Sequence, residues 1–161
     1  MFYIFIIVLI FLLFLLIEYG KREVLPYYKN NGFITNAELS FFKALEQAVG
    51  DRYYIFPQVN LASIVKVNAR GRDWWRYFGK ISRKSIDFIL AEKSSCMPVV
   101  AIELDDSSHF EFARQKRDNF INRVFEKINL PILHISCKSG YNIVQLQEEI
   151  QSILNNVTKG V

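Results

Sequence analysis

The stretch that decides the fold is residues 85–105, SIDFILAEKSSCMPVVAIELD. It contains two apolar runs, residues 85–90 and residues 99–105, which are rich in Ile, Leu and Val and have the length of strands. The polar segment AEKSSCMP between them has the composition of a loop. We therefore expect two consecutive strands that are joined by this loop.

Further helices and strands are expected on both sides of this stretch. Thr35 and Glu38 form the pattern of a capping box, so a helix is expected to begin there. Apolar periodicity predicts helices at residues 35–49, 109–128 and 141–155 and additional strands at residues 53–59 and 131–136. Residues 61–65 are expected to form a short helical turn. Pro57 indicates that its strand lies at a sheet edge or contains a bulge.

The order of elements is α-β-(basic insertion)-β-β-α-β-α, which favours an α/β fold with a mixed sheet and helices on both faces. The chain has 161 residues, of which 51% are hydrophobic, and residues 1–17 are all apolar. The remainder has ordinary globular composition, which excludes a disordered chain and a multi-span transporter. Cys96 and Cys137 form neither a disulfide framework nor a zinc-ligand pattern. We expect one soluble domain at residues 35–156.

The apolar run MFYIFIIVLIFLLFLLI would span about 25 Å as a helix, close to the thickness of a bilayer's hydrocarbon core. A cleaved signal peptide is the alternative, but no Lys or Arg precedes the run and no small-residue cleavage pattern follows it. We expect an uncleaved anchor at residues 1–19 and a linker at residues 20–34. Because Lys21 and Arg22 follow the anchor, the positive-inside rule predicts an inner-membrane protein whose C-terminal domain is cytoplasmic.

Three acidic residues lie in the two strands of residues 85–105. Asp87 is in the middle of the first strand, and Glu103 and Asp105 share one face at the end of the second, because side chains alternate along a strand. If the strands pair as a hairpin, the three carboxylates can converge, and their mutual repulsion indicates a bound cation. Oxygen ligands favour Mg²⁺ or Mn²⁺, which would activate water and neutralise a phosphodiester. The alternatives are solvated strand-end acids, or pairing of Glu103 and Asp105 with Arg114 or Arg117.

Two other polar residues, Glu38 and His109, are candidates for a functional role. Glu38 lies on the inward stripe of its helix, so it either contributes to a site or only completes the capping box. His109 lies where a loop turns into a helix, and it could act as a general acid or base, orient water, or cap the helix. His134 alternates with apolar strand residues and is interpreted as structural.

Residues 66–84, KVNARGRDWWRYFGKISRK, combine positive charge with aromatic side chains and show no clear periodicity. All 20 Lys and Arg residues lie after Gly20, so the soluble part carries the positive excess. The cations could neutralise phosphates while aromatic rings stack on bases, which indicates nucleic acid. A solvated loop and a surface for anionic lipid are the alternatives. The basic residues expected to contact nucleic acid here are Arg70, Arg72, Arg76, Lys80, Arg83 and Lys84.

Five motifs in about residues 34–136 are TNAELSFFKALEQA, FPQV, ISRKSIDFIL, AIELDDSSH and RQKRDNF. In this order they resemble a bacterial family catalogued as domain of unknown function number 2726, and ELDDSSH is the most specific part of the resemblance. That family looks like a branch of the PD-(D/E)xK, restriction-endonuclease-like superfamily and is similar to the very-short-patch repair endonucleases. The resemblance implies an αβββαβ core and metal-dependent cleavage of phosphodiester bonds.

The resemblance also implies roles for individual acids. By position, Glu38 matches the acid of the family's first helix, Asp87 matches the PD aspartate and Glu103 matches the (D/E) residue. Asp105 occupies the position of the motif's lysine, which is expected to orient the attacking water or to stabilise charge. Asp105 and Glu38 would then complete or orient the metal's ligand shell.

The missing lysine requires a substitute if the protein is active. Lys84 could take this role, but strand alternation is expected to turn it away from Asp87. His109 is the better candidate, as in the repair endonucleases that the chain resembles. In the leading hypothesis, Arg114 and Arg117 would hold phosphate.

The leading hypothesis is a membrane-tethered, Mg²⁺- or Mn²⁺-dependent nuclease that acts on DNA. Asp87, Glu103 and the carbonyl of Leu104 would bind the metal. The alternatives are a catalytically inactive nucleic-acid-binding module of the same fold and a membrane-associated interaction protein.

Overall fold

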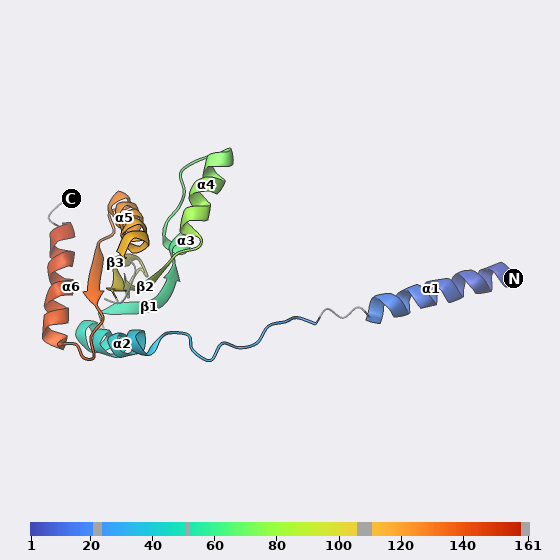
Figure 1. Ribbon diagram of the computed structural model, residues 1–161, viewed down its shortest axis with the longest axis horizontal. Helices are drawn as coiled ribbons and strands as arrows, with labels where there is room; N and C mark the ends of the chain where they lie inside the picture. Colours follow the sequence, from blue (N-terminus) through green and yellow to red (C-terminus); the bar gives the residue numbers. More distant parts are fainter. Residues whose placement is uncertain (21–23, 51, 106–110, 159–161) are drawn as a thin grey trace. The chain divides into compact units, whose positions relative to one another are not determined.

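A computed structural model describes residues 1–20, 24–50, 52–105 and 111–158, with the side chains of 111–118 and 157–158 outside the description. The chain divides into two compact units, residues 1–33 and residues 34–161. The first unit contains helix α1 (Phe2–Gly20), none of whose residues is buried (Figure 1). This helix is long and apolar enough to cross a membrane.

The second unit is built on a four-stranded mixed sheet in the order β1-β2-β3-β4. The strands are β1 (Tyr53–Asn60), β2 (Ser85–Glu92), β3 (Pro98–Asp105) and β4 (Ile132–Ser136). β1, β2 and β3 pair antiparallel, and β4 joins β3 in parallel after helix α5 (Glu111–Lys127). The expected strand pair within residues 85–105 and the mixed sheet are therefore confirmed.

Helices cover both faces of the sheet, as the sequence predicts (Figure 1). One apolar cluster joins the sheet to α2 (Asn36–Val49) and α6 (Ile143–Thr158). The other joins it to α5, α3 (Leu61–Ile64) and α4 (Gly71–Ile81). Strand alternation sends Ile102 into the first cluster and Ala101 into the second. Burial on both faces explains why β2 and β3 are almost continuously apolar.

The capping box at the start of α2 is confirmed. The Thr35 hydroxyl accepts the N–H of Glu38 at 3.2 Å, and a carboxylate oxygen of Glu38 accepts the N–H of Thr35 at 2.6 Å. One turn later, the ring centroid of Phe41 lies 5.4 Å from that of Phe88 on β2. The cap and this aromatic contact place the first turn of α2, and with it Glu38, close to the strand that carries Asp87.

The basic segment differs from the expectation, because residues 71–81 form the regular helix α4. Its periodicity is carried by Trp74, Phe78 and Ile81, which recur at helical spacing. Ile81 is buried and Phe78 packs against the second apolar cluster, whereas Trp75 is 69% exposed. The interleaved arginines and glycines hid this stripe from a reading of the sequence.

Candidate functional site

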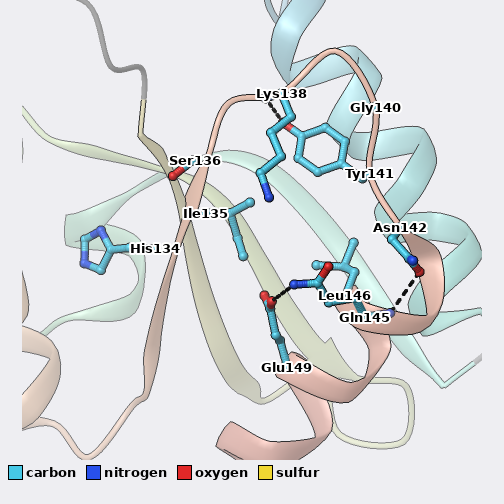
Figure 2. Close-up of a pocket in the computed structure, with 10 residues that line it drawn as sticks. All are labelled: His134, Ile135, Ser136, Lys138, Gly140, Tyr141, Asn142, Gln145, Leu146 and Glu149. Carbon is cyan, nitrogen blue, oxygen red and sulfur yellow. Dashed lines mark hydrogen bonds between the residues drawn. The ribbon is translucent and has the colours of Figure 1, made fainter.

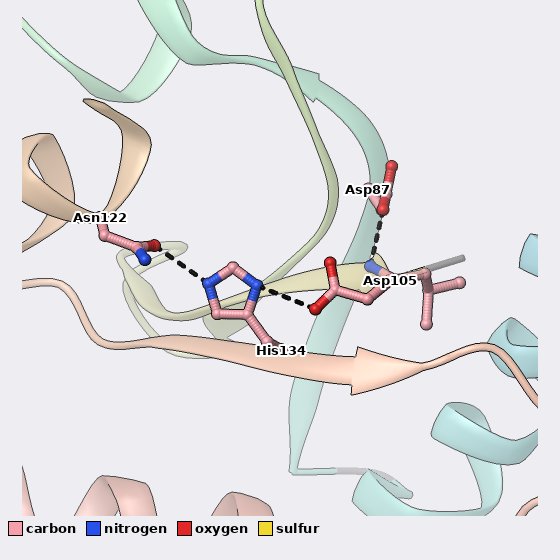
Figure 3. A network of polar contacts seen from close by, with 5 residues as sticks. Asp87, Asp105, Asn122 and His134 are labelled. Carbon is pink, nitrogen blue, oxygen red and sulfur yellow. Dashed lines mark hydrogen bonds and ion pairs between the residues drawn. The ribbon is translucent and has the colours of Figure 1, made fainter. Parts of the chain in front are cut away.

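The centre of the candidate site is the point where the pairing of β2 with β3 ends. Their antiparallel pairs run from Ala91–Pro98 to Phe88–Ile102. Beyond the last pair, Oδ2 of Asp87 accepts a hydrogen bond from the backbone N–H of Leu104 at 2.8 Å (Figure 3). The Asp87 carboxylate therefore replaces a backbone carbonyl as the acceptor for this N–H. It is half-buried and lies where the two strands separate.

Glu103 precedes Leu104 and is the buried charged residue among the described side chains, with an exposed fraction of 8%. It lies opposite His134 in the parallel pairing of β3 with β4. Oxygen Oε1 of Glu103 is itself buried. A carboxylate in such a place is retained at a cost in free energy unless protons, donors or cations compensate it. Glu103 is therefore a buried carboxylate that lies directly beside the contact between Asp87 and Leu104.

Asp105 faces away from Leu104 towards β4, where its Oδ2 lies 3.4 Å from Nδ1 of His134. The other ring nitrogen, Nε2, lies 3.0 Å from Oδ1 of Asn122 on α5 (Figure 3). The Asp105 and His134 side chains are 46% and 31% exposed, so this contact is open to solvent. His134, interpreted from the sequence as structural, therefore lies beside the candidate site and orients one of its acids.

A cavity of about 300 Å³ adjoins Asp87 and is lined by Gln58, Arg83, Lys84 and Ser85. Lys84 therefore lies on the same cavity as Asp87. Strand alternation, which was expected to turn Lys84 away, does not apply to it, because β2 begins only at Ser85. The Lys84 ammonium also lies 5.7 Å from the ring centroid of Phe120 on α5. The side chains of Arg83, Lys84 and Asp87 thus line one polar cavity.

Gln58, which lines this cavity, also contacts Glu38. Gln58 was not predicted from the sequence to be a site residue. The side-chain amide of Gln58 donates to Oε1 of Glu38 at 2.5 Å. Gln58 lies between the pairs Pro57–Phe88 and Val59–Ile86 and has a φ of 52°, in the left-handed region. β1 is an edge strand with an irregularity next to Pro57, as that proline indicated. In the sequence, Pro57 was the feature that indicated an irregular backbone next to Gln58.

The sequence predicts that Asp87, Glu103 and Asp105 converge on a divalent ion. Within the described residues, no three His, Cys, Asp or Glu side chains lie close enough together to hold a metal ion by themselves. Mg²⁺, however, commonly binds through one or two carboxylates and takes its other oxygens from water and substrate phosphate. Asp87 and Glu103, with the carbonyl of Leu104 between Glu103 and Asp105, supply that kind of set.

Three predicted site residues cannot be placed in this geometry. His109 lies outside the described residues. Arg114 and Arg117 belong to α5, but their side chains are outside the description.

The remaining predicted cations lie on or next to α4. Arg76 pairs with Asp73 at 3.2 Å and lies 4.8 Å from the ring centroid of Tyr77. Trp74 stacks on Phe78, with ring centroids 4.6 Å apart and planes inclined by 11°. The other basic residues of this surface are Arg70, at the N-cap, Arg72 and Lys80 on the helix, and Arg83 just after it. The result is a cationic, aromatic helix whose first turns are exposed.

A second cavity, of about 350 Å³, lies between the end of β4 and the start of α6 (Figure 2). Several of its polar groups are hydrogen-bonded within the turn that leads into α6. The Tyr141 hydroxyl accepts the N–H of Lys138 at 3.2 Å, and the side chain of Asn142 accepts the N–H of Gln145 at 3.2 Å. These contacts shape the turn into α6, and neither Asp87 nor Glu103 lines the cavity.

Comparison with protein families gives one match. The family described as "Protein of unknown function (DUF2726)" matches residues 31–153. Comparison with curated proteins and with solved structures gives no match. The family match covers every strand and every helix from α2 to α5, together with most of α6.

Proposed function

This chain belongs to the DUF2726 family, and we propose that it is a metal-dependent, nuclease-like protein that cleaves DNA phosphodiester bonds. The observation that carries the proposal is the placement of two acids where β2 and β3 separate. Asp87 holds the N–H of Leu104, and the adjacent Glu103 is buried. Two carboxylates on neighbouring strands, one of which lines a cavity with Arg83 and Lys84, suit binding of a divalent ion and a phosphate.

The order of elements supports assignment to the PD-(D/E)xK superfamily. α2, β1, β2, β3, α5 and β4 reproduce the αβββαβ order that the resemblance implies. Under this assignment α3 and α4 are an insertion between β1 and β2. The similarity to the very-short-patch repair endonucleases rests on the ELDDSSH motif, residues 103–109.

The surroundings of each site residue suggest its role in the proposed reaction. Asp87, Glu103 and the carbonyl of Leu104 would hold Mg²⁺ or Mn²⁺, which when bound would neutralise charge on the phosphate and activate water. Lys84 lies on the Asp87 cavity and would hold the phosphate there. Asp105, held by His134, would orient the ligand shell from the solvent side.

His109, Arg114 and Arg117 have the two remaining roles in the proposal. His109 would transfer a proton to or from the reacting oxygen in place of the missing lysine. Arg114 and Arg117 on α5 would hold a phosphate of the DNA strand.

The basic helix α4 would bind the DNA backbone. Arg72 and Lys80 provide charge for phosphates, which gives affinity for any sequence. The exposed ring of Trp75 offers a surface on which an unpaired base can stack. The apolar side of α4 is occupied elsewhere, because Phe78 and Ile81 pack against the core. Trp75 and Tyr77 remain exposed among the cations, so anionic lipid is the competing ligand for this helix.

The N-terminal unit would tether the protein to the inner membrane. α1 has the length and composition of a membrane span, and Lys21 and Arg22 follow it, so the domain would be cytoplasmic. A long apolar helix near the N-terminus also fits a signal sequence, whose cleavage would instead release the domain on the far side of the membrane.

A catalytically inactive nucleic-acid-binding module is the second candidate. It is favoured by Asp105, which stands at the position of the lysine in the PD-(D/E)xK superfamily motif and which contacts His134. A nuclease assay separates the two functions. The full chain, purified in detergent, would be incubated with Mg²⁺, Mn²⁺ or EDTA and with single-stranded, duplex or mismatched DNA. Cleavage that EDTA abolishes supports the nuclease, whereas binding without cleavage under either metal supports the inactive module.

A further inference from the structure

Gln58 has a backbone conformation that its own residue type does not explain. Its φ of 52° lies in the left-handed region, which residues with a Cβ atom adopt rarely and at a cost. The pairs on either side of it, Pro57–Phe88 and Val59–Ile86, belong to one uninterrupted register. Gln58 therefore departs from the regular strand conformation, while the pairing of β1 with β2 keeps the same register on both sides of it.

This conformation brings the side chain of Gln58 to Glu38. The amide Nε2 donates to Oε1 of Glu38 at 2.5 Å, while Oε2 of Glu38 accepts the N–H of Thr35 at 2.6 Å. The two oxygens of Glu38 are thus held by one contact within α2 and one contact from the sheet. The capping box accounts for the first contact but not for the second.

The same residue faces the candidate site. In the register of β1 with β2, the position of Gln58 falls opposite Asp87, and both residues line the cavity of about 300 Å³. An amide donor fixes a carboxylate without neutralising it, whereas Lys or Arg at this position would form an ion pair. Gln58 therefore fixes Glu38 and keeps its negative charge, and it links this acid to the cavity that Asp87 lines.

We propose that Gln58 is a positioning residue that holds Glu38 against the Asp87 cavity, so that Glu38 acts in metal binding as well as in capping α2. This inference rests on the proposed function. Outer-shell partners of this kind change metal affinity by about 10- to 100-fold when they are removed.

The test uses the full chain with Gln58→Asn. Asn adopts the left-handed region more readily than most residues, but its shorter side chain cannot span the distance to Glu38. Gln58→Gly, which accepts this backbone conformation freely, is the second variant, and Gln147→Asn on the exposed side of α6 is the matched control. Mn²⁺ affinity is measured without DNA, from the rise in melting temperature with Mn²⁺ concentration. Single-turnover cleavage of DNA is measured in parallel.

Both Gln58 variants should melt near the wild-type temperature without metal and should bind Mn²⁺ ~10-fold or more weakly. Cleavage should fall with Mn²⁺ affinity, and Gln147→Asn should match the wild type. Because Gln58 acts through the charge of Glu38, Gln58→Asn should cause little further loss in a chain that already carries Glu38→Gln. Wild-type Mn²⁺ affinity in both variants would overturn the positioning role while leaving the nuclease proposal intact. A wild-type chain that neither responds to Mn²⁺ nor cleaves DNA would overturn both.

Discussion

The carboxylate of Asp87 accepts the backbone N–H of Leu104 at 2.8 Å, immediately beyond the last backbone pair of β2 with β3. The contact has a structural and a chemical side. It satisfies a backbone donor where the strands separate, and it fixes one oxygen of an acid whose neighbour across the gap is the buried Glu103. Substitutions at Asp87 can separate these two roles.

We predict opposite stability effects for Asp87→Asn and Asp87→Ala in the metal-free protein. Asn keeps an oxygen for the Leu104 N–H and removes one of two negative charges at the strand ends, so the free energy of unfolding should rise. Ala leaves the N–H without its acceptor and should lower that free energy by about 1–3 kcal/mol. Urea unfolding of both variants measures the difference. An Asp87→Asn variant no more stable than the wild type would show that charge repulsion at this point is negligible.

The acids of β3 should differ in their importance for metal binding. Glu103 is buried beside Leu104, whereas the Asp105 carboxylate is half-exposed and directed at His134. Glu103→Gln should therefore weaken Mn²⁺ binding by more than about tenfold, and Asp105→Asn should weaken it less. The dependence of melting temperature on Mn²⁺ concentration provides the measurement. An Asp105→Asn defect as large as that of Glu103→Gln would place Asp105 among the direct ligands.

Trp75 and Trp74 should separate DNA binding from stability. Trp75 is 69% exposed, so Trp75→Ala should change the free energy of unfolding by no more than about 0.5 kcal/mol. It should weaken binding of single-stranded DNA by about 1–3 kcal/mol through loss of base stacking. Trp74 stacks on Phe78, so Trp74→Ala should destabilise the protein. Fluorescence anisotropy measures binding, and co-sedimentation with anionic vesicles is the comparison. A Trp75→Ala defect confined to vesicle binding would assign α4 to lipid.

The membrane orientation is tested in cells. With α1 as an uncleaved anchor followed by Lys21 and Arg22, the domain should be cytoplasmic and should resist protease added to intact spheroplasts. It should become sensitive once the membrane is opened. Digestion of the domain in intact spheroplasts would contradict the orientation, and a mature chain lacking residues 1–19 would identify a cleaved signal sequence.

The sequence predicted the fold better than the contacts of the site. The pattern of Thr35 and Glu38 located the start of α2, and apolar runs located β2 and β3, because capping and strand periodicity are local properties. α4 was missed because its apolar stripe alternates with arginines within a single short helix. An apolar stripe can be recognised in a sequence only when the helix is long enough for the stripe to recur several times.

The contacts of the site depend on register between strands that are far apart in sequence. Asp105 meets His134 only because β3 and β4 pair in parallel with Glu103 opposite His134. Gln58 reaches Glu38 only because its backbone turns into the left-handed region. Neither the register nor the backbone irregularity can be deduced from the composition of the strands.

The central claim is that Asp87 supports metal-dependent cleavage of DNA. The most direct measurement is single-turnover cleavage by the full chain in Mn²⁺, for the wild type, Asp87→Ala and Glu148→Gln, an exposed acid on α6 that serves as the matched control. The account predicts that the wild type and Glu148→Gln cleave at the same rate, that Asp87→Ala does not cleave, and that all three bind DNA with similar affinity. Equal DNA binding by all three with no cleavage by any of them, in Mn²⁺ or Mg²⁺, would contradict the nuclease and establish the inactive module.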